Sequence, residues 1–156
     1  MKIFGFAGWS GSGKTTLIEQ VIPRFVRAGL KVSLIKHAHH RFDVDHPGKD
    51  SYRHRHAGCS EVLVTSKLRW ALMHELRGAR EPTLEEMIKL IAPCDLLLIE
   101  GYKREPLDKL EVYRSTLGEA LRHENVTVMI ATHDREIIAM PHVKRLHLEA
   151  GRVNAR

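Results

Sequence analysis

Residues 8 to 15 read Gly8-Trp9-Ser10-Gly11-Ser12-Gly13-Lys14-Thr15 and match the pattern G-x-x-x-x-G-K-[ST] in full. An apolar run from Lys2 to Ala7 precedes this stretch and is typical of a short buried strand. Apolar residues at helical spacing follow, from about Gly13 to Ala28, and Gly29 is a helix stop signal. A glycine-rich turn between a strand and a helix predicts a loop whose backbone amides bind a polyphosphate.

Each residue type in this loop has a physical role. The glycines allow positive φ and let the backbone approach a ligand closely. Lys14 is expected to reach the β- and γ-phosphates, and the Thr15 hydroxyl is expected to hold Mg²⁺. The predicted nucleotide-binding residues of the loop are Gly8, Ser10, Gly11, Ser12, Gly13, Lys14, Thr15 and Thr16.

An acidic partner for the metal is expected at the end of a neighbouring strand. The stretch from Asp95 to Glu100, DLLLIE, is the strongest candidate for an interior strand, with a carboxylate at each end. Ligands of parallel sheets lie at the carboxyl ends of the strands. Glu100 is therefore predicted to orient the Mg²⁺ shell or a water, and Asp95 to be a solvated residue at the opposite edge of the sheet.

The remaining pattern alternates strands with helices and predicts an α/β fold. We expect a P-loop NTPase-type, mostly parallel sheet flanked by helices, with an antiparallel hairpin, in a single domain over residues 1–156. Thr83 and Glu86 predict a capping box, and Pro23 should kink or break the first helix. The other expected strands are 31–36, 61–65, 69–74, 109–113, 126–131 and 143–148, and the other expected helices are 50–57, 83–90 and 117–122.

The loop KHAHHRFDVDHPGKD, residues 36–50, should emerge at the same sheet edge as the phosphate loop. Its histidines suggest zinc, but no cysteine lies nearby to complete a structural site, so we favour a polar loop. A contact with phosphate, substrate or solvent and ligation of a metal all stay open for this loop. Asp45 is the best acid here to bind the metal or its water. The predicted catalytic group is Lys14, Glu100 and Asp45, and the predicted metal ligands are Thr15, Asp45 and Glu100.

Composition limits the classes of partner. The formal net charge is +6, which suits an anionic ligand. Aromatic residues make up only 6% and the basic residues are dispersed, so nucleic acid is not an expected partner. No stretch approaches the roughly 20 apolar residues of a membrane span. Cys59 and Cys94 form no CxxC pair and are expected to be buried, reduced thiols. We therefore expect a cytoplasmic protein.

Several longer blocks carry a resemblance to a known family. GWSGSGKTT, LIKHAHHRFDVDHPGKDSYRHRHAG, RWALM and LLLIEGYK, in this order between Ile3 and Val112, resemble the MobB family of molybdopterin-guanine dinucleotide biosynthesis accessory proteins. The histidine-rich block and RWALM are more specific to it than the phosphate loop. The resemblance implies a weakly hydrolysing, GTP-binding homodimer. It also implies a MobA-like nucleotidyltransferase partner that joins GMP to molybdopterin, and a histidine-rich loop that faces nucleotide or pterin.

The sequence motifs for guanine recognition and for GTP hydrolysis are less complete than the motif for phosphate binding. GTPases usually read guanine with an N/T-K-x-D box, and the nearest piece here is Thr132-His133-Asp134, without the lysine. Asp134 is the candidate for this contact. Hydrolysis is expected to be slow, because the sequence offers no clear arginine finger or water-positioning glutamine. Arg104, or an arginine of a second subunit, is the candidate for that role.

Two alternative functions stay open at this point. A small-molecule P-loop kinase would use Arg77 and Arg80 as a lid over the phosphates, although a solvated turn is the simpler interpretation of that segment. A non-catalytic module would deliver a nucleotide or pterin to a partner enzyme.

Overall fold

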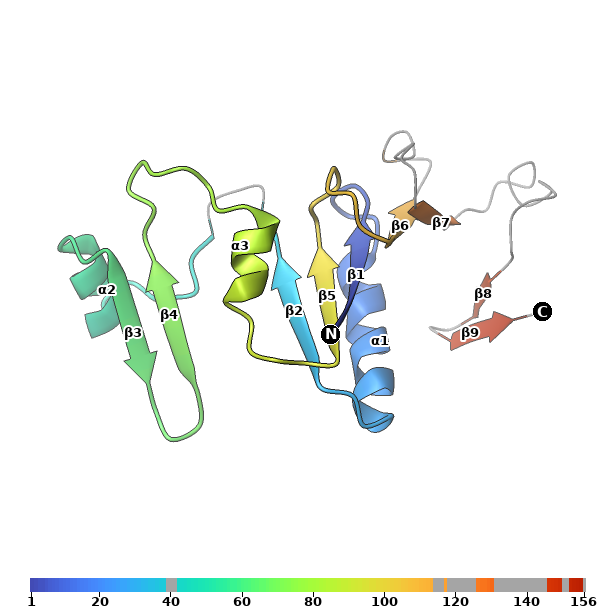
Figure 1. Cartoon of the computed structure of the whole chain (residues 1–156), viewed down its shortest axis with the longest axis horizontal. Coiled ribbons are helices and arrows are strands. Elements are labelled where there is room, and N and C mark those ends of the chain that lie inside the picture. The colour runs from blue at the N-terminus through green and yellow to red at the C-terminus, as the bar shows by residue number, and fades with distance from the viewer. Residues whose placement is uncertain (39–41, 114–116, 118–125, 131–145, 150–151, 156) are drawn as a thin grey trace. The chain divides into compact units, whose positions relative to one another are not determined.

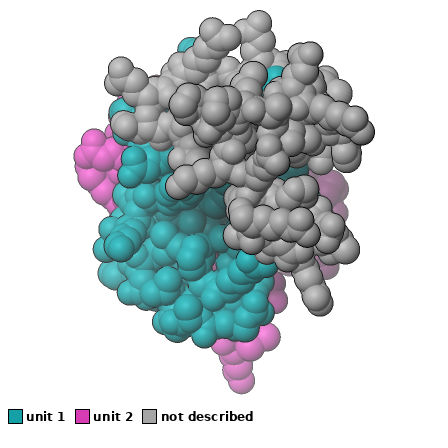
Figure 2. Space-filling model, turned by 90° about the vertical axis from the view of Figure 1, so that its right-hand side faces the viewer, with its two compact units in different colours: residues 1–37, 93–156 teal, residues 38–92 magenta. Residues whose placement is uncertain are grey.

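The computed structural model describes residues 1–38, 42–113, 117, 126–130, 146–149 and 152–155, and the last three ranges by their backbone alone. The chain divides into two compact units, residues 1–37 with 93–156 and residues 38–92 (Figure 2). A compact unit need not be an independently folding domain. The single domain expected from the sequence therefore stays a prediction.

A five-stranded sheet forms the centre of the first unit. Its strand order is β2-β5-β1-β6-β7, and every neighbouring pair is parallel. Figure 1 shows β2, β5 and β1 side by side. The strands are β1 (Lys2–Ala7), β2 (Val32–Lys36), β5 (Leu96–Glu100), β6 (Lys109–Tyr113) and β7 (Val126–Ile130). The predicted α/β class with a mostly parallel sheet is confirmed.

Helix α1 (Lys14–Arg27) leaves the phosphate loop and returns toward β2. Two bonds close its C-terminus, from Gly29 N to the oxygen of Val26 (3.0 Å) and from Leu30 N to the oxygen of Phe25 (3.1 Å). With Gly29 at a φ of 84°, this is a Schellman motif, which satisfies carbonyls that a helix end would otherwise leave unpaired. The predicted stop at Gly29 is confirmed.

The predicted break of α1 at Pro23 is wrong, since the helix continues through this residue. A proline inside a helix removes one backbone hydrogen bond. Here the apolar face of the helix offsets that loss by packing on the sheet. Phe6, Ile18 and Leu98 form the buried cluster between them, each less than 5% exposed. The partly buried side chains around this cluster are Phe4, Leu17, Ile22, Val32, Leu96 and Leu110.

The second unit is built from α2 (Asp50–His56), the antiparallel hairpin of β3 (Glu61–Thr65) and β4 (Trp70–His74), and α3 (Leu84–Lys89). The capping box of α3 is present: Glu86 N donates to Thr83 Oγ1 (3.2 Å), and Thr83 N donates to a Glu86 carboxylate oxygen (2.8 Å). The predicted hairpin and the predicted helix start are both confirmed.

Near the C-terminus, β8 (Leu146–Glu149) pairs antiparallel with β9 (Arg152–Ala155). The first of these overlaps the strand predicted over 143–148, whereas the second had no counterpart in the sequence prediction. The helix predicted over 117–122 falls outside the described residues, apart from Leu117. None of the helices in the described ranges is long and apolar enough to cross a bilayer.

Candidate phosphate-binding site

The loop between β1 and α1 has the backbone geometry of a phosphate cradle. Gly8, Gly11 and Gly13 all adopt positive φ, at 134°, 78° and 101°. Gly13 is the N-cap of α1 and, having no side chain, makes no capping hydrogen bond to the first turn of this helix. The amides at a helix start have no intrahelical partner, so this end of α1 suits an anion.

Gly8 is required for a second, steric reason. A Cβ at this position would lie 2.4 Å from the carbonyl oxygen of Val112 and 3.0 Å from Ser12 Oγ. Val112 belongs to β6, the strand that pairs with β1. At Gly8, where the loop starts, the backbone therefore lies too close to the backbone of β6 to leave space for a side chain.

Lys14 folds back over this loop. Its Nζ donates to the carbonyl oxygens of Gly8 (3.0 Å) and Trp9 (2.7 Å) and to Ser12 Oγ (3.4 Å). Burial lowers the pKa of the Lys14 ammonium. The Glu100 carboxylate raises this pKa, and the charges of two further lysines, 103 and 36, lower it. Three ammonium groups and one carboxylate thus act on one another at the loop.

Glu100 ends β5 and is only 6% exposed. Thr15 Oγ1 donates to its carboxylate at 3.2 Å, and Lys36 Nζ lies 3.4 Å from the same oxygen. Lys36 is level with Glu100 because β2 and β5 run in parallel register. The structure therefore brings Glu100 to the phosphate loop, as the sequence predicted.

The Thr15–Glu100 pair fits Mg²⁺. Magnesium prefers hard oxygen ligands and binds through one or two protein groups together with waters and substrate phosphates. A hydroxyl and a carboxylate already within 3.2 Å of each other provide such a set. The group of three or more metal-binding side chains that a dedicated cage would need does not occur among the described residues.

Asp95 lies at the other end of the sheet, as expected, but it is not merely solvated. One carboxylate oxygen accepts a hydrogen bond from Lys31 N (2.8 Å), just before β2. Asp95 N in turn donates to the carbonyl oxygen of Lys31 (2.9 Å). This residue joins the starts of two neighbouring strands, which is a structural role.

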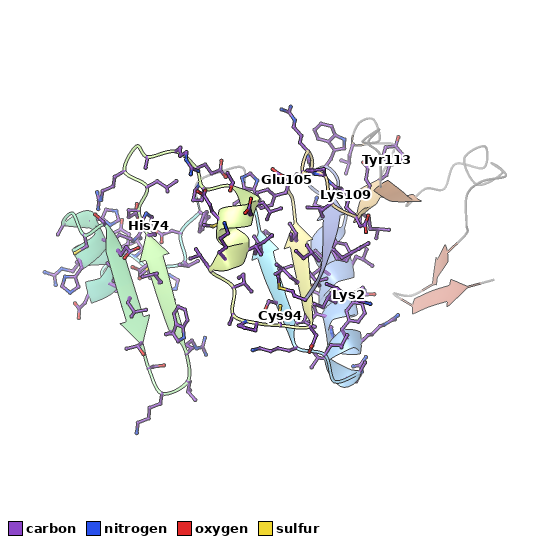
Figure 3. The ribbon with its side chains drawn as sticks, viewed as in Figure 1. Lys2, His74, Cys94, Glu105, Lys109 and Tyr113 are labelled. Carbon is purple, nitrogen blue, oxygen red and sulfur yellow. The ribbon has the colours of Figure 1, made fainter. Side chains whose placement is uncertain are left out.

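The loop that follows β5 contributes residues that the sequence did not single out. Lys109 Nζ donates to the carbonyl oxygens of Tyr102 (3.3 Å), Lys103 (2.9 Å) and Glu105 (2.6 Å). Figure 3 places the labelled Glu105 and Lys109 near each other in this region. The Lys109 residue is 3% exposed, and burial lowers its pKa, while Glu105 raises it.

Glu111 is a second buried charge that the sequence did not single out. It has no solvent exposure and pairs with Ala7, the last residue before the phosphate loop. In KLEVY, Lys109 and Glu111 alternate with apolar residues, a pattern that usually means a solvent-facing side of a strand. For Lys109, the loop of residues 101–108 covers this side of the strand with the carbonyl oxygens that its ammonium binds.

Asp45, predicted to join the metal site, belongs to the second unit. Its carboxylate accepts from Ser51 Oγ and from His46 N, both at 2.9 Å, and lies 3.9 Å from Arg55 Nε. Arg55 also pairs with Asp43 (2.6 Å) and with Glu75 (2.7 Å). These contacts give Asp45 a structural role in its own loop, and its metal-binding role stays a prediction.

The remaining residues predicted from the sequence differ in how far they are exposed to solvent. Ser10, Thr15 and Thr16 are exposed at the loop surface, whereas Ser12 is buried inside it. Asp134, the predicted guanine contact, lies outside the described residues. Cys94 is half-buried and Cys59 is exposed, which corrects the expectation of two buried thiols.

The family model for MobB, described as molybdopterin guanine dinucleotide synthesis protein B, matches residues 3–135. The chain belongs to the MobB family. The match includes the phosphate loop, Glu100 and the loop after β5. It confirms the resemblance seen in the sequence.

Individual relatives agree with this assignment. The molybdopterin-guanine dinucleotide biosynthesis adapter protein of Escherichia coli (strain K12) is 40% identical over 94% of this chain and 81% of its own length. The adapter protein of the same name from Haemophilus influenzae is 40% identical over 76% of this chain and 67% of its own. A crystal structure of a MobB homolog from Bacillus stearothermophilus is similar with a TM-score of 0.56 and 28% identity. That alignment covers 74% of this chain and 66% of that one.

Proposed function

We propose that this protein is a GTP-binding, slowly hydrolysing adapter of molybdopterin guanine dinucleotide biosynthesis, which assists a MobA-like nucleotidyltransferase. The observation that carries the proposal is the Thr15–Glu100 contact beside a lysine-bearing phosphate cradle. The names of the two relatives, both molybdopterin-guanine dinucleotide biosynthesis adapter proteins, support the pathway. In this proposal Mg²⁺ is held by Thr15 and Glu100 and supplies charge neutralisation for the β- and γ-phosphates.

Each residue of this chain then has a separate task. The amides of the loop bind the phosphate oxygens, and Lys14 exchanges its carbonyl partners for them. Glu100 orients Thr15 through their hydrogen bond and keeps a negative charge next to the metal. Lys36, at 3.4 Å, limits the repulsion between Glu100 and the nucleotide.

The kinase alternative depends on Arg77 and Arg80 as a phosphate lid. Arg80 pairs with both carboxylate oxygens of Glu86, at 2.8 and 2.5 Å. Arg77 donates to the carbonyl oxygens of Arg55 (2.8 Å) and Cys59 (2.9 Å). Because both guanidinium groups hold the second unit together, the adapter is the better supported proposal.

Homodimer formation is supported by the hairpin of the second unit. Leu63 faces Leu72 and Thr65 faces Trp70 across the two strands, so these side chains share one face. Leu63, Trp70 and Leu72 are 61%, 70% and 50% exposed. Apolar side chains grouped in this way on a small hairpin are typical of an interaction surface.

Nucleotide binding and selectivity are tested first. Calorimetric titration with GTP and with ATP, each with Mg²⁺, should give tighter binding of GTP and no measurable binding to Lys14→Ala. Equal affinity for the two nucleotides would remove the guanine preference. Retention of GTP affinity in Lys14→Ala would remove the phosphate cradle.

The adapter role needs a partner experiment. Co-purification with the nucleotidyltransferase is expected to depend on GTP, and the product nucleotide should form faster when both proteins and GTP are present. Association that does not depend on the nucleotide would contradict a GTP-gated adapter and favour the simple delivery module.

Light scattering of the wild type and of Trp70→Ser tests the dimer, which the substitution should weaken.

A further inference from the structure

Lys103 lies over the phosphate loop. Its Nζ is 4.1 Å from the centroid of the Trp9 ring, within the range of a cation–π contact. Trp9 is the second residue of the loop, and its side chain is partly exposed. The loop after β5 thus reaches the cradle with a positive charge that the motif G-x-x-x-x-G-K-[ST] does not include.

The backbone around Lys103 is held tightly. Lys109 donates to three carbonyl oxygens, those of residues 102, 103 and 105, and only a protonated amine has three hydrogens to give. Tyr102 adopts a left-handed φ of 43°, and the preceding Gly101 has a φ of 100°, with a Cβ there only 3.0 Å from that of His37. A loop fixed at so many points presents Lys103 in a defined place.

The charge around the loop exceeds what its carboxylate neutralises. Lys103 and Lys36 are close enough to Lys14 for their charges to lower its pKa, and Glu100 is the carboxylate that opposes them. The four groups sum to two positive charges. That excess suits the several negative charges of a triphosphate better than it suits a neutral ligand.

We propose that Lys103 is a second phosphate-binding lysine of this site, which exchanges the Trp9 ring for phosphate oxygens when a polyphosphate enters the cradle. This inference rests on the proposed nucleotide binding. An exposed cation–π contact is weaker than a hydrogen bond between an ammonium and a phosphate. The exchange is therefore favourable, and Trp9 changes its environment as it occurs.

The test uses the fluorescence of Trp9. The chain has two tryptophans, so a Trp70→Phe background leaves Trp9 alone. Titration with GTP and Mg²⁺ should change the Trp9 emission, while calorimetry on the same samples gives the affinity. Lys103→Met, which keeps the length of the side chain without its charge, should lower the affinity roughly tenfold or more and change the emission before any ligand is added.

Two controls make the result specific. Lys31→Met removes an exposed lysine at the opposite end of the same sheet and should leave the affinity and emission unchanged. Inorganic tripolyphosphate replaces GTP in a parallel titration. Because Lys103 is proposed to contact the phosphates and not the base, its loss should lower the affinity for GTP and for tripolyphosphate by the same factor.

The outcomes separate this inference from the proposed function. If neither wild type nor variants bind GTP or tripolyphosphate, both the proposed function and this inference are wrong. If the wild type binds GTP and Lys103→Met binds it equally well, the inference alone is overturned. A loss confined to GTP would also overturn it, because Lys103 would then act on the base.

Discussion

Two ammonium groups of the first unit, those of Lys14 and Lys109, donate to backbone carbonyls, whereas Arg55 of the second unit pairs with carboxylates. Lys14 and Lys109 donate to main-chain oxygens, so the phosphate loop keeps an excess of positive charge. Arg55 pairs with Asp43 and Glu75, which neutralises it. The charges of the phosphate loop therefore suit the proposed anion, whereas the ion pairs of Arg55 hold the loop of the second unit in place.

The two units also differ in where their apolar residues lie. The first has a buried cluster around Leu98, which is 1% exposed. In the described part of the second unit, Leu84 is the one residue in the buried class, and Leu63 is 61% exposed. Burial of apolar surface is the main favourable term in folding. The first unit therefore carries more of the stability, and the second offers more surface to a partner.

A pair of leucine substitutions should produce the largest effect and tests this contrast directly. Leu98→Ala removes a buried side chain and should cost about 3 kcal/mol of the free energy of unfolding. Leu63→Ala removes an exposed one and should change it by less than about 0.5 kcal/mol in dilute protein. Urea unfolding followed by circular dichroism measures both. Similar losses for the two variants would break the comparison.

The next largest effect is expected from a pair of glycine substitutions, one of them in the phosphate loop. Gly8→Ala places a Cβ 2.4 Å from the Val112 carbonyl at a φ of 134°, so the backbone of the site must move. Gly48→Ala also has a positive φ, of 90°, but open space around it. The free energy of unfolding of Gly48→Ala should fall only by the roughly 1 kcal/mol that left-handed strain costs. That of Gly8→Ala should fall further, and this variant should also bind GTP weakly. Melting curves and titrations that do not distinguish the variants would contradict this account.

The smallest effect is a pH dependence in the second unit. Hydrogen bonds from Arg80 and from the Thr83 amide lower the pKa of Glu86 from 4.5 to about 2. A carboxyl group with a depressed folded-state pKa stabilises the fold above its unfolded pKa and loses that contribution as the pH falls toward the folded value. The melting temperature of wild type should exceed that of Glu86→Gln above pH 4.5, and the gap should close toward pH 2. A gap independent of pH would show that the charge of Glu86 does not stabilise α3.

The features that could be predicted from sequence are those with a local cause. The strand, glycine loop and helix of residues 2–27 follow from periodicity and from glycine positions. The capping box of Thr83 and Glu86 depends on two residues three apart. The position of Glu100 beside the phosphate loop was predicted correctly, because the carboxyl ends of parallel strands meet at one edge of the sheet.

The features that could not be predicted depend on contacts distant in the sequence. Lys109 and Glu111 look solvent-facing in KLEVY, but Lys109 binds a carbonyl of the loop after β5, and Glu111 lies in a strand that pairs with β1. Nothing in the sequence distinguishes Lys103 from the other lysines, and its position over Trp9 is seen only in the fold. Pro23 was expected to kink or break its helix, and the break does not occur, because packing of the apolar face onto the sheet outweighs the lost hydrogen bond. In each case tertiary structure overrode a local rule.

A crystal of this protein soaked with GTP and Mg²⁺ provides the most direct test of the central claim. We expect triphosphate density along the amides of residues 8–16, with Lys14 Nζ turned from its carbonyl partners to the phosphates and the metal next to Thr15. Nucleotide density elsewhere on the molecule, with no phosphate in this cradle, would contradict it.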